Sequence, residues 1–180
     1  MAYPTDTLYG LGADATSEIA VTGINKLKGR SGAPISIMVA SPLQMLAMID
    51  DTYGFATILV NAFLPGPLTL IGHTDYPVAE SLRAEDDSVG FRCPDHDFCR
   101  RVTEAFGKPL TTTSVNPSGQ IPAVDLDSIR TYFPRELDLI VDAGSIKGNA
   151  GSTIVDITTP TPRILRSGAI PDARIMETLN

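Results

Sequence analysis

The stretch Leu110-Thr111-Thr112-Thr113-Ser114-Val115-Asn116-Pro117-Ser118-Gly119 is the most informative part of the chain for its class of fold. Its β-branched threonines favour a strand, and Asn116-Pro117 then predicts a turn. Ser114 and Asn116 alternate, so both side chains would face one side if the strand persists. Ligands in α/β folds often bind beyond the carboxyl ends of strands. The stretch therefore predicts a strand that ends in a polar site at this turn, as in an α/β domain; a turn with capping side chains is the alternative.

The rest of the chain alternates between helical and strand-like segments. Helices are predicted after caps at Thr16-Ser17, Ser41-Pro42, Asp95, and Asp125 or Asp127, and over residues 53–63 and 172–179. Further strands are predicted at residues 35–40, 68–72, 89–92, 139–141, 153–157 and 164–165. These strands outnumber those of a simple doubly wound fold, so we expect a mixed sheet with helices packed against it.

Composition limits the kind of protein. With 180 residues, 43% hydrophobic and 19% charged, and with no linker-like tract, residues 1–180 are predicted to form one globular domain. The net charge of −7 disfavours broad binding to nucleic-acid backbones, so any anion site must be a local cationic pocket. Cys93 and Cys99 do not form a C-x-x-C pattern, and we expect buried thiols and no metal site.

Targeting signals are not evident. No apolar run reaches the roughly 18 residues that a membrane span needs, and no stretch at the start resembles a signal peptide. We therefore expect a cytoplasmic protein with no membrane partner. The motif beginning at Pro4 comes almost directly after Met1, so no leading helix or full strand is expected before it.

Three cations in Lys26-Leu27-Lys28-Gly29-Arg30-Ser31-Gly32 lie at the end of a predicted helix. Glycines there let a ligand approach the backbone, and Lys and Arg suit a polyphosphate. The alternative is that exposed basic residues compensate the helix dipole, and the residues alone favour neither interpretation. The spacing of a Walker loop is absent.

Three more segments carry unusual polarity. Pro4-Thr5-Asp6-Thr7-Leu8-Tyr9-Gly10-Leu11-Gly12 offers hydroxyls and backbone amides to a small polar ligand, although an ordinary turn is favoured without further context. Arg166, downstream of Gly151-Ser152-Thr153, either reaches a phosphate or is solvated. Arg92 follows the apolar run Val89-Gly90-Phe91, where an arginine needs a partner or a ligand.

Seven segments, taken in order, resemble the YrdC-like domain of the threonylcarbamoyl-AMP synthase family. They are Pro4-Thr-Asp-Thr-Leu-Tyr-Gly-Leu-Gly12, Lys28-Gly-Arg30, Pro65-Gly-Pro-Leu-Thr69, Val89-Gly-Phe-Arg-Cys-Pro94, Ser114-Val-Asn-Pro-Ser-Gly119, Ser152-Thr-Ile-Val-Asp156 and Leu165-Arg-Ser-Gly168. The resemblance implies a twisted mixed α/β sheet with flanking helices and a deep cationic cavity. The resemblance is to the short, single-domain form of the family. The strand and helix that precede the first motif in the family are not expected in this sequence.

The resemblance also implies an activity. An L-threonylcarbamoyladenylate synthase is a nucleotidyltransferase that condenses L-threonine, bicarbonate and ATP to threonylcarbamoyl-AMP and pyrophosphate, with Mg²⁺ bridging the phosphates. A partner complex then transfers the threonylcarbamoyl group to tRNA, and direct tRNA binding by the synthase is expected to be weak. Two anions must approach each other in this reaction, so the site must neutralise charge and position its substrates.

Residue roles follow from the family pattern by position. The residues implied to bind ATP are Lys28, Arg30, Ser88, Asn116 and Arg166, of which Lys28 and Arg30 are also the catalytic cations. The residues implied to bind threonine are Thr7, Arg92, Ser114 and Ser152. No protein ligand to a metal is implied.

Two other functions are compatible with the same kind of domain. One is a non-catalytic RNA-binding module, which the net charge of −7 disfavours. The other is the carbamoyl-adenylate domain of hydrogenase maturation proteins. Those proteins carry additional zinc-finger and acylphosphatase-like domains, for which this chain has neither the length nor the cysteines.

Overall fold

The computed structural model describes residues 1–29, 35–146 and 150–179. Its helices are α1 (Glu18–Lys28), α2 (Pro42–Met48), α3 (Phe55–Phe63), α4 (Asp97–Phe106), α5 (Leu126–Tyr132) and α6 (Asp172–Leu179), with a 3-10 turn, η1 (Glu80–Leu82). Its strands are β1 (Ala2–Pro4), β2 (Tyr9–Leu11), β3 (Ser36–Met38), β4 (Leu68–Gly72), β5 (Val89–Arg92), β6 (Leu110–Ser114), β7 (Thr153–Asp156) and β8 (Arg163–Arg166). The predicted α/β class is confirmed. None of the described helices is long and apolar enough to cross a membrane.

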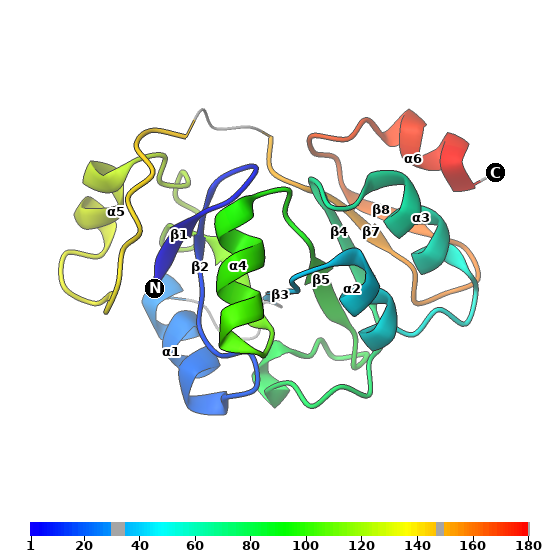
Figure 1. Cartoon of the computed structure of the whole chain (residues 1–180), viewed down its shortest axis with the longest axis horizontal. Helices are drawn as coiled ribbons and strands as arrows, with labels where there is room; N and C mark the ends of the chain where they lie inside the picture. Colours follow the sequence, from blue (N-terminus) through cyan, green and yellow to red (C-terminus); the bar gives the residue numbers. More distant parts are fainter. Residues whose placement is uncertain (30–34, 147–149, 180) are drawn as a thin grey trace.

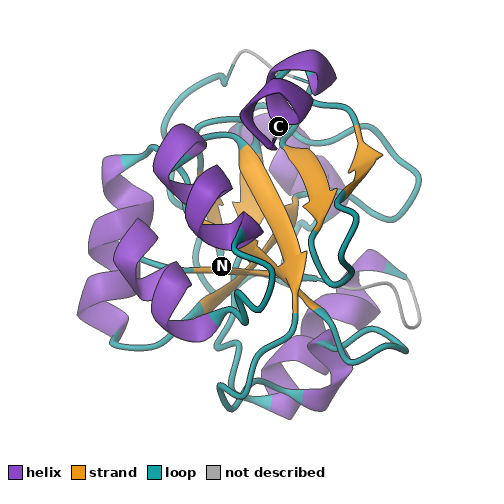
Figure 2. Ribbon diagram, turned by 90° about the vertical axis from the view of Figure 1, so that its right-hand side faces the viewer, coloured by secondary structure: helices purple, strands orange, loops and turns teal. Residues whose placement is uncertain are grey.

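The described strands form one sheet in the order β1-β2-β6-β3-β5-β4-β7-β8. The pairs β3–β5 and β4–β7 are parallel and the other neighbours are antiparallel, so the predicted mixed sheet is confirmed. The strands twist across the sheet (Figure 2). Helices α1 and α5 lie beside the β1 end, α3 and α6 lie beside the β8 end, and α4 lies in front of the middle (Figure 1).

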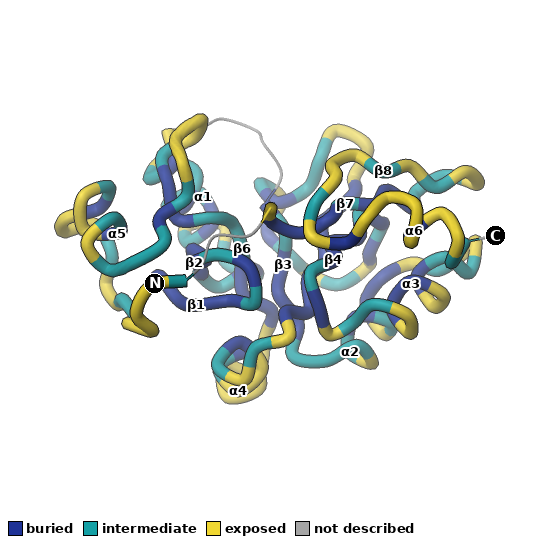
Figure 3. The backbone as a smooth tube through the Cα atoms, turned by 90° about the horizontal axis from the view of Figure 1, so that it is seen from above, coloured by how far each residue is buried: buried dark blue, intermediate teal, exposed yellow. Residues whose placement is uncertain are grey.

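One face of the sheet is apolar. Ile37, Phe91, Leu70 and Val155 are register partners on four neighbouring strands, and all are buried. Directly paired residues point to the same face, so these side chains form a continuous row within the main core. Burying each such side chain stabilises the fold by about 1.5–3 kcal/mol. The strands at the centre of the molecule are accordingly its most buried part (Figure 3).

The next row of paired residues along the strands points its side chains to the opposite face of the sheet. These side chains are apolar at the β6 end and mostly polar farther along. The register partners of this row, from β6 to β8, are Leu110, Met38, Arg92, Thr69, Ile154 and Arg166. At the β6 end, Leu110 and Met38 pack with Tyr3 and with Cys99 of α4. The rest of the row carries two arginines and a hydroxyl. This face therefore supplies the polar groups from which a site can be built.

The helix caps predicted from the sequence are largely observed. Ser17 and Ser41 cap α1 and α2 through their side chains, and Asp125 caps α5 in a capping box. Gly107 ends α4 in the left-handed conformation, as its place just past the predicted helix indicates.

The predicted cap of α4 at Asp95 is wrong. His96 is the N-cap, and its ring Nδ1 accepts the backbone N–H of Phe98 at 3.2 Å. The backbone N–H of Asp95 instead donates to the Asp6 carboxylate at 3.3 Å. A long-range contact therefore holds Asp95 before the helix begins.

The start of the chain forms a strand, where no full strand was expected. Ala2–Pro4 pairs with β2, and on its other side Ala2 exchanges backbone hydrogen bonds with Leu139 and Val141. The prediction of a strand at residues 139–141 is wrong, because these residues form only a single isolated bridge to β1. The short β1 strand limits how far such pairing can extend.

Both cysteines are buried and form no disulfide. Burial raises the pKa of Cys93 to about 11 and the pKa of Cys99 to about 12. Both thiols therefore stay protonated at neutral pH and behave as apolar side chains. The predicted buried thiols are confirmed.

Gly168, two residues after β8, is required by a close backbone approach. A Cβ at this position would overlap the backbone of Ser152 and Thr153, whereas a Cβ at Gly23, inside α1, meets nothing within 4 Å. We expect Gly168→Ala to lower the free energy of unfolding by about 1–3 kcal/mol. Gly23→Ala should raise it by about 0.5–1 kcal/mol. Urea unfolding measures both, and changes of the same sign would contradict this explanation.

Candidate functional site

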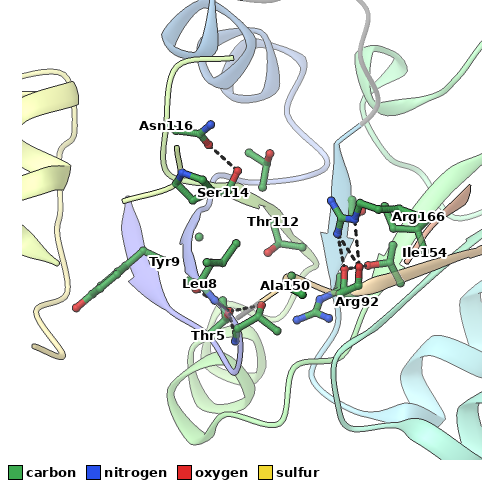
Figure 4. A pocket seen from close by; sticks show the side chains of 18 of the residues that line it. Thr5, Leu8, Tyr9, Arg92, Thr112, Ser114, Asn116, Ala150, Ile154 and Arg166 are labelled. Carbon is green, nitrogen blue, oxygen red and sulfur yellow. Dashed lines mark hydrogen bonds between the residues drawn. The ribbon is translucent and has the colours of Figure 1, made fainter. Parts of the chain in front are cut away.

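A cavity of about 640 Å³ opens on the polar face of the sheet, a size typical of small-molecule sites. Residues 5, 7–10, 112–124 and 150–154 contribute most of its wall, with Ser114 and Asn116 on one side and Arg92 and Arg166 on the other (Figure 4). Its cationic residues are Lys28, Arg92 and Arg166, and no described residue of the lining is Asp or Glu. The cavity therefore suits an anionic ligand.

The turn between β1 and β2 is held by Thr5. Its hydroxyl donates to the carbonyl of Leu8 at 2.7 Å and accepts the N–H groups of Thr7 and Leu8, each at 3.2 Å. Thr7 lies buried in the cavity wall. This local network fixes the turn without help from a ligand.

The turn after β6 is held by Lys28, the last residue of α1. Its ammonium donates to the carbonyl oxygens of Ser114 at 2.6 Å and Asn116 at 2.9 Å, and to Asn116 Oδ1 at 3.1 Å. The Ser118 N–H donates in return to the Lys28 carbonyl at 2.8 Å. Lys28 is only 3% exposed, and these carbonyl dipoles help to stabilise its charge. The buried cation thereby fixes the wall that carries Ser114 and Asn116.

Arg92 forms a buried ion pair with Asp6. Nη2 lies 2.6 Å from Asp6 Oδ1, and the two side chains are 7% and 10% exposed. Nη1 lies 3.4 Å from the carbonyl oxygens of both Gly66 and Leu68. An arginine in this apolar strand was expected to need a partner or a ligand, and Asp6, 86 positions away in the sequence, is that partner.

Arg166 holds the opposite wall through Ser152. Nε and Nη2 donate to the Ser152 carbonyl at 3.2 and 2.8 Å, and Nη2 also donates to Ser152 Oγ at 3.0 Å. The Ser152 and Thr69 hydroxyls lie 2.7 Å apart. Partial desolvation, and secondly the nearby charge of Arg92, lower the pKa of Arg166, although a guanidinium stays charged in proteins. An anion close to both arginines would relieve their repulsion.

The cavity brings together most of the residues predicted for the site. Its lining includes Thr7, Lys28, Arg92, Ser114, Asn116, Ser152 and Arg166. Arg30 lies outside the described residues. Ser88 is not in the lining: it precedes β5, at the opposite end from Arg92, and its hydroxyl donates to Asp86 at 2.7 Å. The contacts of these residues with ATP and threonine stay predictions.

Sequence reasoning missed three residues that shape the cavity. Asp6 was not assigned a partner, Thr69 was not assigned a role, and Tyr9 was counted only as part of a motif. The Tyr9 hydroxyl donates to the Gly144 carbonyl at 2.8 Å and accepts the Ala143 N–H at 2.9 Å. The sequence did show a carboxylate, Asp6, and a phenol, Tyr9, within a motif of small polar residues. Such a motif does not identify bonding partners more than 80 positions away.

A protein-family model described as "Telomere recombination" (Sua5_yciO_yrdC) matches residues 1–168. The chain belongs to the Sua5/YciO/YrdC family. A putative threonylcarbamoyl-AMP synthase from Mycobacterium tuberculosis is 35% identical over 177 residues, which are 98% of the chain and 81% of that protein. The threonylcarbamoyl-AMP synthase of Homo sapiens is 33% identical over 172 residues, 89% of the chain and 59% of that protein.

A solved structure of the same family has the same fold. Sua5 from P. abyssi, complexed with L-threonine, matches with a TM-score of 0.90 and 32% identity, over 99% of this chain and 53% of that one. The chain thus spans about half the length of this neighbour. The predicted family and fold are confirmed. The predicted enzyme class, a nucleotidyltransferase, is confirmed by the names of the relatives.

Replacing Lys28 tests whether its ammonium holds the cavity wall. We expect Lys28→Met to lower the free energy of unfolding by about 2–3 kcal/mol, because three acceptors, two of them in buried bonds, lose a charged donor. Lys26→Met changes an exposed residue of the same helical turn and should alter it by no more than about 0.5 kcal/mol. Urea denaturation measures both. Equal effects at the two positions would show that the contacts of Lys28 do not stabilise the fold.

Proposed function

We propose that the chain is an L-threonylcarbamoyladenylate synthase, which condenses L-threonine, bicarbonate and ATP to threonylcarbamoyl-AMP and pyrophosphate. The observation that carries the proposal is one cavity walled by hydroxyl-bearing turns on one side and by Arg92 and Arg166 on the other (Figure 4). The names of the relatives and the threonine complex of the P. abyssi neighbour support the same reaction.

The reaction has two bond-forming steps. The neutral threonine amine attacks the carbon of bicarbonate, and water leaves as the carbamate forms. If it attacks the carbon dioxide in equilibrium with bicarbonate, the amine instead loses a proton to solvent. A carbamate oxygen then attacks the α-phosphorus of ATP, the bond to the bridging oxygen breaks, and pyrophosphate leaves. The product is a mixed anhydride of the carbamate and AMP. Both reactants of the second step are anions, so the protein must neutralise charge and hold them in line.

We assign the amino-acid subsite to the wall that contains Arg92. A guanidinium binds a carboxylate through parallel N–H bonds, and Arg92 is the more buried of the two cavity arginines. The hydroxyls of Thr7, Ser114 and Ser152 would orient the amine and the side chain of threonine. Hydroxyl groups suit this task because each can donate and accept.

We assign the ATP subsite to Arg166, Asn116 and Lys28, together with Arg30. The family pattern adds Ser88, which lies outside the cavity wall. Arg166 would approach the phosphates through Nη1, because its Nε and Nη2 already donate to Ser152. The Lys28 ammonium already donates to the turn that carries Asn116. To reach a phosphate it would exchange one of these bonds, so part of its role in this proposal is to hold Asn116 in place.

In this proposal ATP enters with Mg²⁺ already bound to its phosphates, as part of the substrate. Mg²⁺ often keeps several waters and few protein ligands in such complexes. The described residues of the cavity wall contain no carboxylate, and no group of three or more His, Cys, Asp or Glu residues is found in the described chain to hold a metal. This composition fits a metal ion that the phosphates carry.

The product would be consumed by a separate enzyme complex that transfers the threonylcarbamoyl group to an adenosine of tRNA, a process that we place in the cytoplasm. The net charge of −7 opposes a broad tRNA-binding surface on this chain. The activated anhydride, rather than a stable tRNA complex, would therefore link the two reactions.

Pyrophosphate release, with each substrate omitted in turn, tests the proposal. We expect release only when L-threonine, bicarbonate and ATP are all present. Arg166→Lys should lower kcat/KM at least about tenfold, because a lysine cannot supply forked donors. Arg163→Lys is the matched control, since Arg163 lies on the same strand, is 63% exposed and does not line the cavity; it should change kcat/KM by less than about twofold.

ATP turnover that is indifferent to threonine would contradict the proposed synthase. If the protein makes no adenylate but binds RNA in a salt-sensitive way, and if Arg30→Ala still binds RNA, the RNA-binding alternative would be favoured over the synthase.

A further inference from the structure

We propose that Asp6 is a positioning residue for the amino-acid subsite: it holds the Arg92 guanidinium in the orientation that presents its remaining N–H groups to a carboxylate in the cavity. The inference rests on the proposed function, because that function supplies an α-amino acid as the ligand of Arg92. It adds a residue that acts through Arg92 rather than on the substrate.

Asp6 acts from outside the cavity wall. Arg92 is among the lining residues and Asp6 is not, although Asp6 Oδ1 lies only 2.6 Å from Arg92 Nη2. Both side chains are nearly inaccessible to water. Charge-assisted hydrogen bonds in such a setting are strong and directional. The pair therefore restricts how the guanidinium can turn.

The hydrogen bonds of Arg92 show which donors remain for a ligand. Nη1 faces the carbonyl oxygens of Gly66 and Leu68, and Nη2 donates to Asp6. Within the described part of the chain, no hydrogen bond from Nε is present. A guanidinium carries five N–H groups in a fixed planar fork. The Nε–H and the second N–H of Nη2 are therefore the donors that remain for a carboxylate.

Asp6 is itself held in place by two segments. Its Oδ2 accepts the Asp95 N–H just before α4, and its backbone lies in the turn locked by the Thr5 hydroxyl. A carboxylate tethered in this way can orient an arginine. A mobile surface carboxylate could not, because the two side chains would move together.

The negative charge of Asp6 has two opposed effects on the subsite. It orients Arg92, which favours binding of a carboxylate, and it offsets part of the positive charge, which disfavours it. A guanidinium stays charged in proteins. Two parallel bonds also require a defined orientation. We therefore expect the loss of orientation to dominate when Asp6 is neutralised.

The test compares Asp6→Asn with Asp156→Asn in the full chain. Asn keeps the shape of Asp but removes its charge. Asp156 is the matched control: it is also buried and paired with an arginine, Arg163 at 2.7 Å, but it does not line the cavity or contact Arg92. The readouts are the Kd of L-threonine by calorimetry, the KM values of threonine and ATP for pyrophosphate release, and the thermal midpoint.

Asp6→Asn should raise the Kd and KM of threonine about tenfold and change the KM of ATP by less than about twofold. Asp156→Asn should lower the thermal midpoint and leave all three constants unchanged. Asp6→Glu, which keeps the charge but shifts it by one methylene, should fall between wild type and Asp6→Asn. It decides the matter if Asp6→Asn does not fold.

A folded Asp6→Asn variant that binds threonine as tightly as wild type, or more tightly, would overturn the positioning role. An equal rise in the KM of ATP would also overturn it. Direct measurement of threonine binding distinguishes failure of the positioning role from failure of the proposed function. If wild-type protein binds threonine but releases no pyrophosphate, the proposed synthase is contradicted. The Kd values of wild type and Asp6→Asn can then still be compared, so the role of Asp6 is still tested. Wild-type protein that binds no threonine overturns both.

Discussion

A positive charge in the middle of the sheet is the constraint on which much of this structure depends. Arg92 lies on β5, between Met38 and Thr69 in register, and is almost completely buried. An unpaired charge in such a place would cost several kcal/mol. The chain meets this constraint by bringing the turn between β1 and β2 over the sheet, so that Asp6 reaches Arg92. The position of that turn also determines where Thr7 lies.

The cavity is the part of this face that the helices leave uncovered. Near β6, α4 covers Met38 and Leu110 and completes a small apolar cluster with them. Farther along the same row, Thr69 and Arg166 have no such cover and line the cavity. A single row of register partners thus serves packing at one end and ligand chemistry at the other.

The sequence predicted local structure well because local structure has local causes. Ser41-Pro42 begins a helix through its own cap, and Leu68–Gly72 is a strand because of its own composition. Two errors had non-local causes: Asp95 is held by Asp6, and pairing at residues 139–141 is limited by the length of β1. Seven of the residues predicted for the site through motifs line the cavity, whereas their bonds within the protein were not predicted.

The span of these bonds along the chain has a consequence for folding. Lys28 joins a turn 86 to 88 positions away, Asp6 joins Arg92 over 86 positions, and Tyr9 joins Gly144 over 135 positions. Contacts of such sequence separation form late, since long loops must close before the contacts can stabilise anything. No nascent or partly folded chain would hold a complete cavity. A ligand that occupies the cavity would therefore draw the equilibrium toward the fully folded chain, and would stabilise the fold as well as occupy the site.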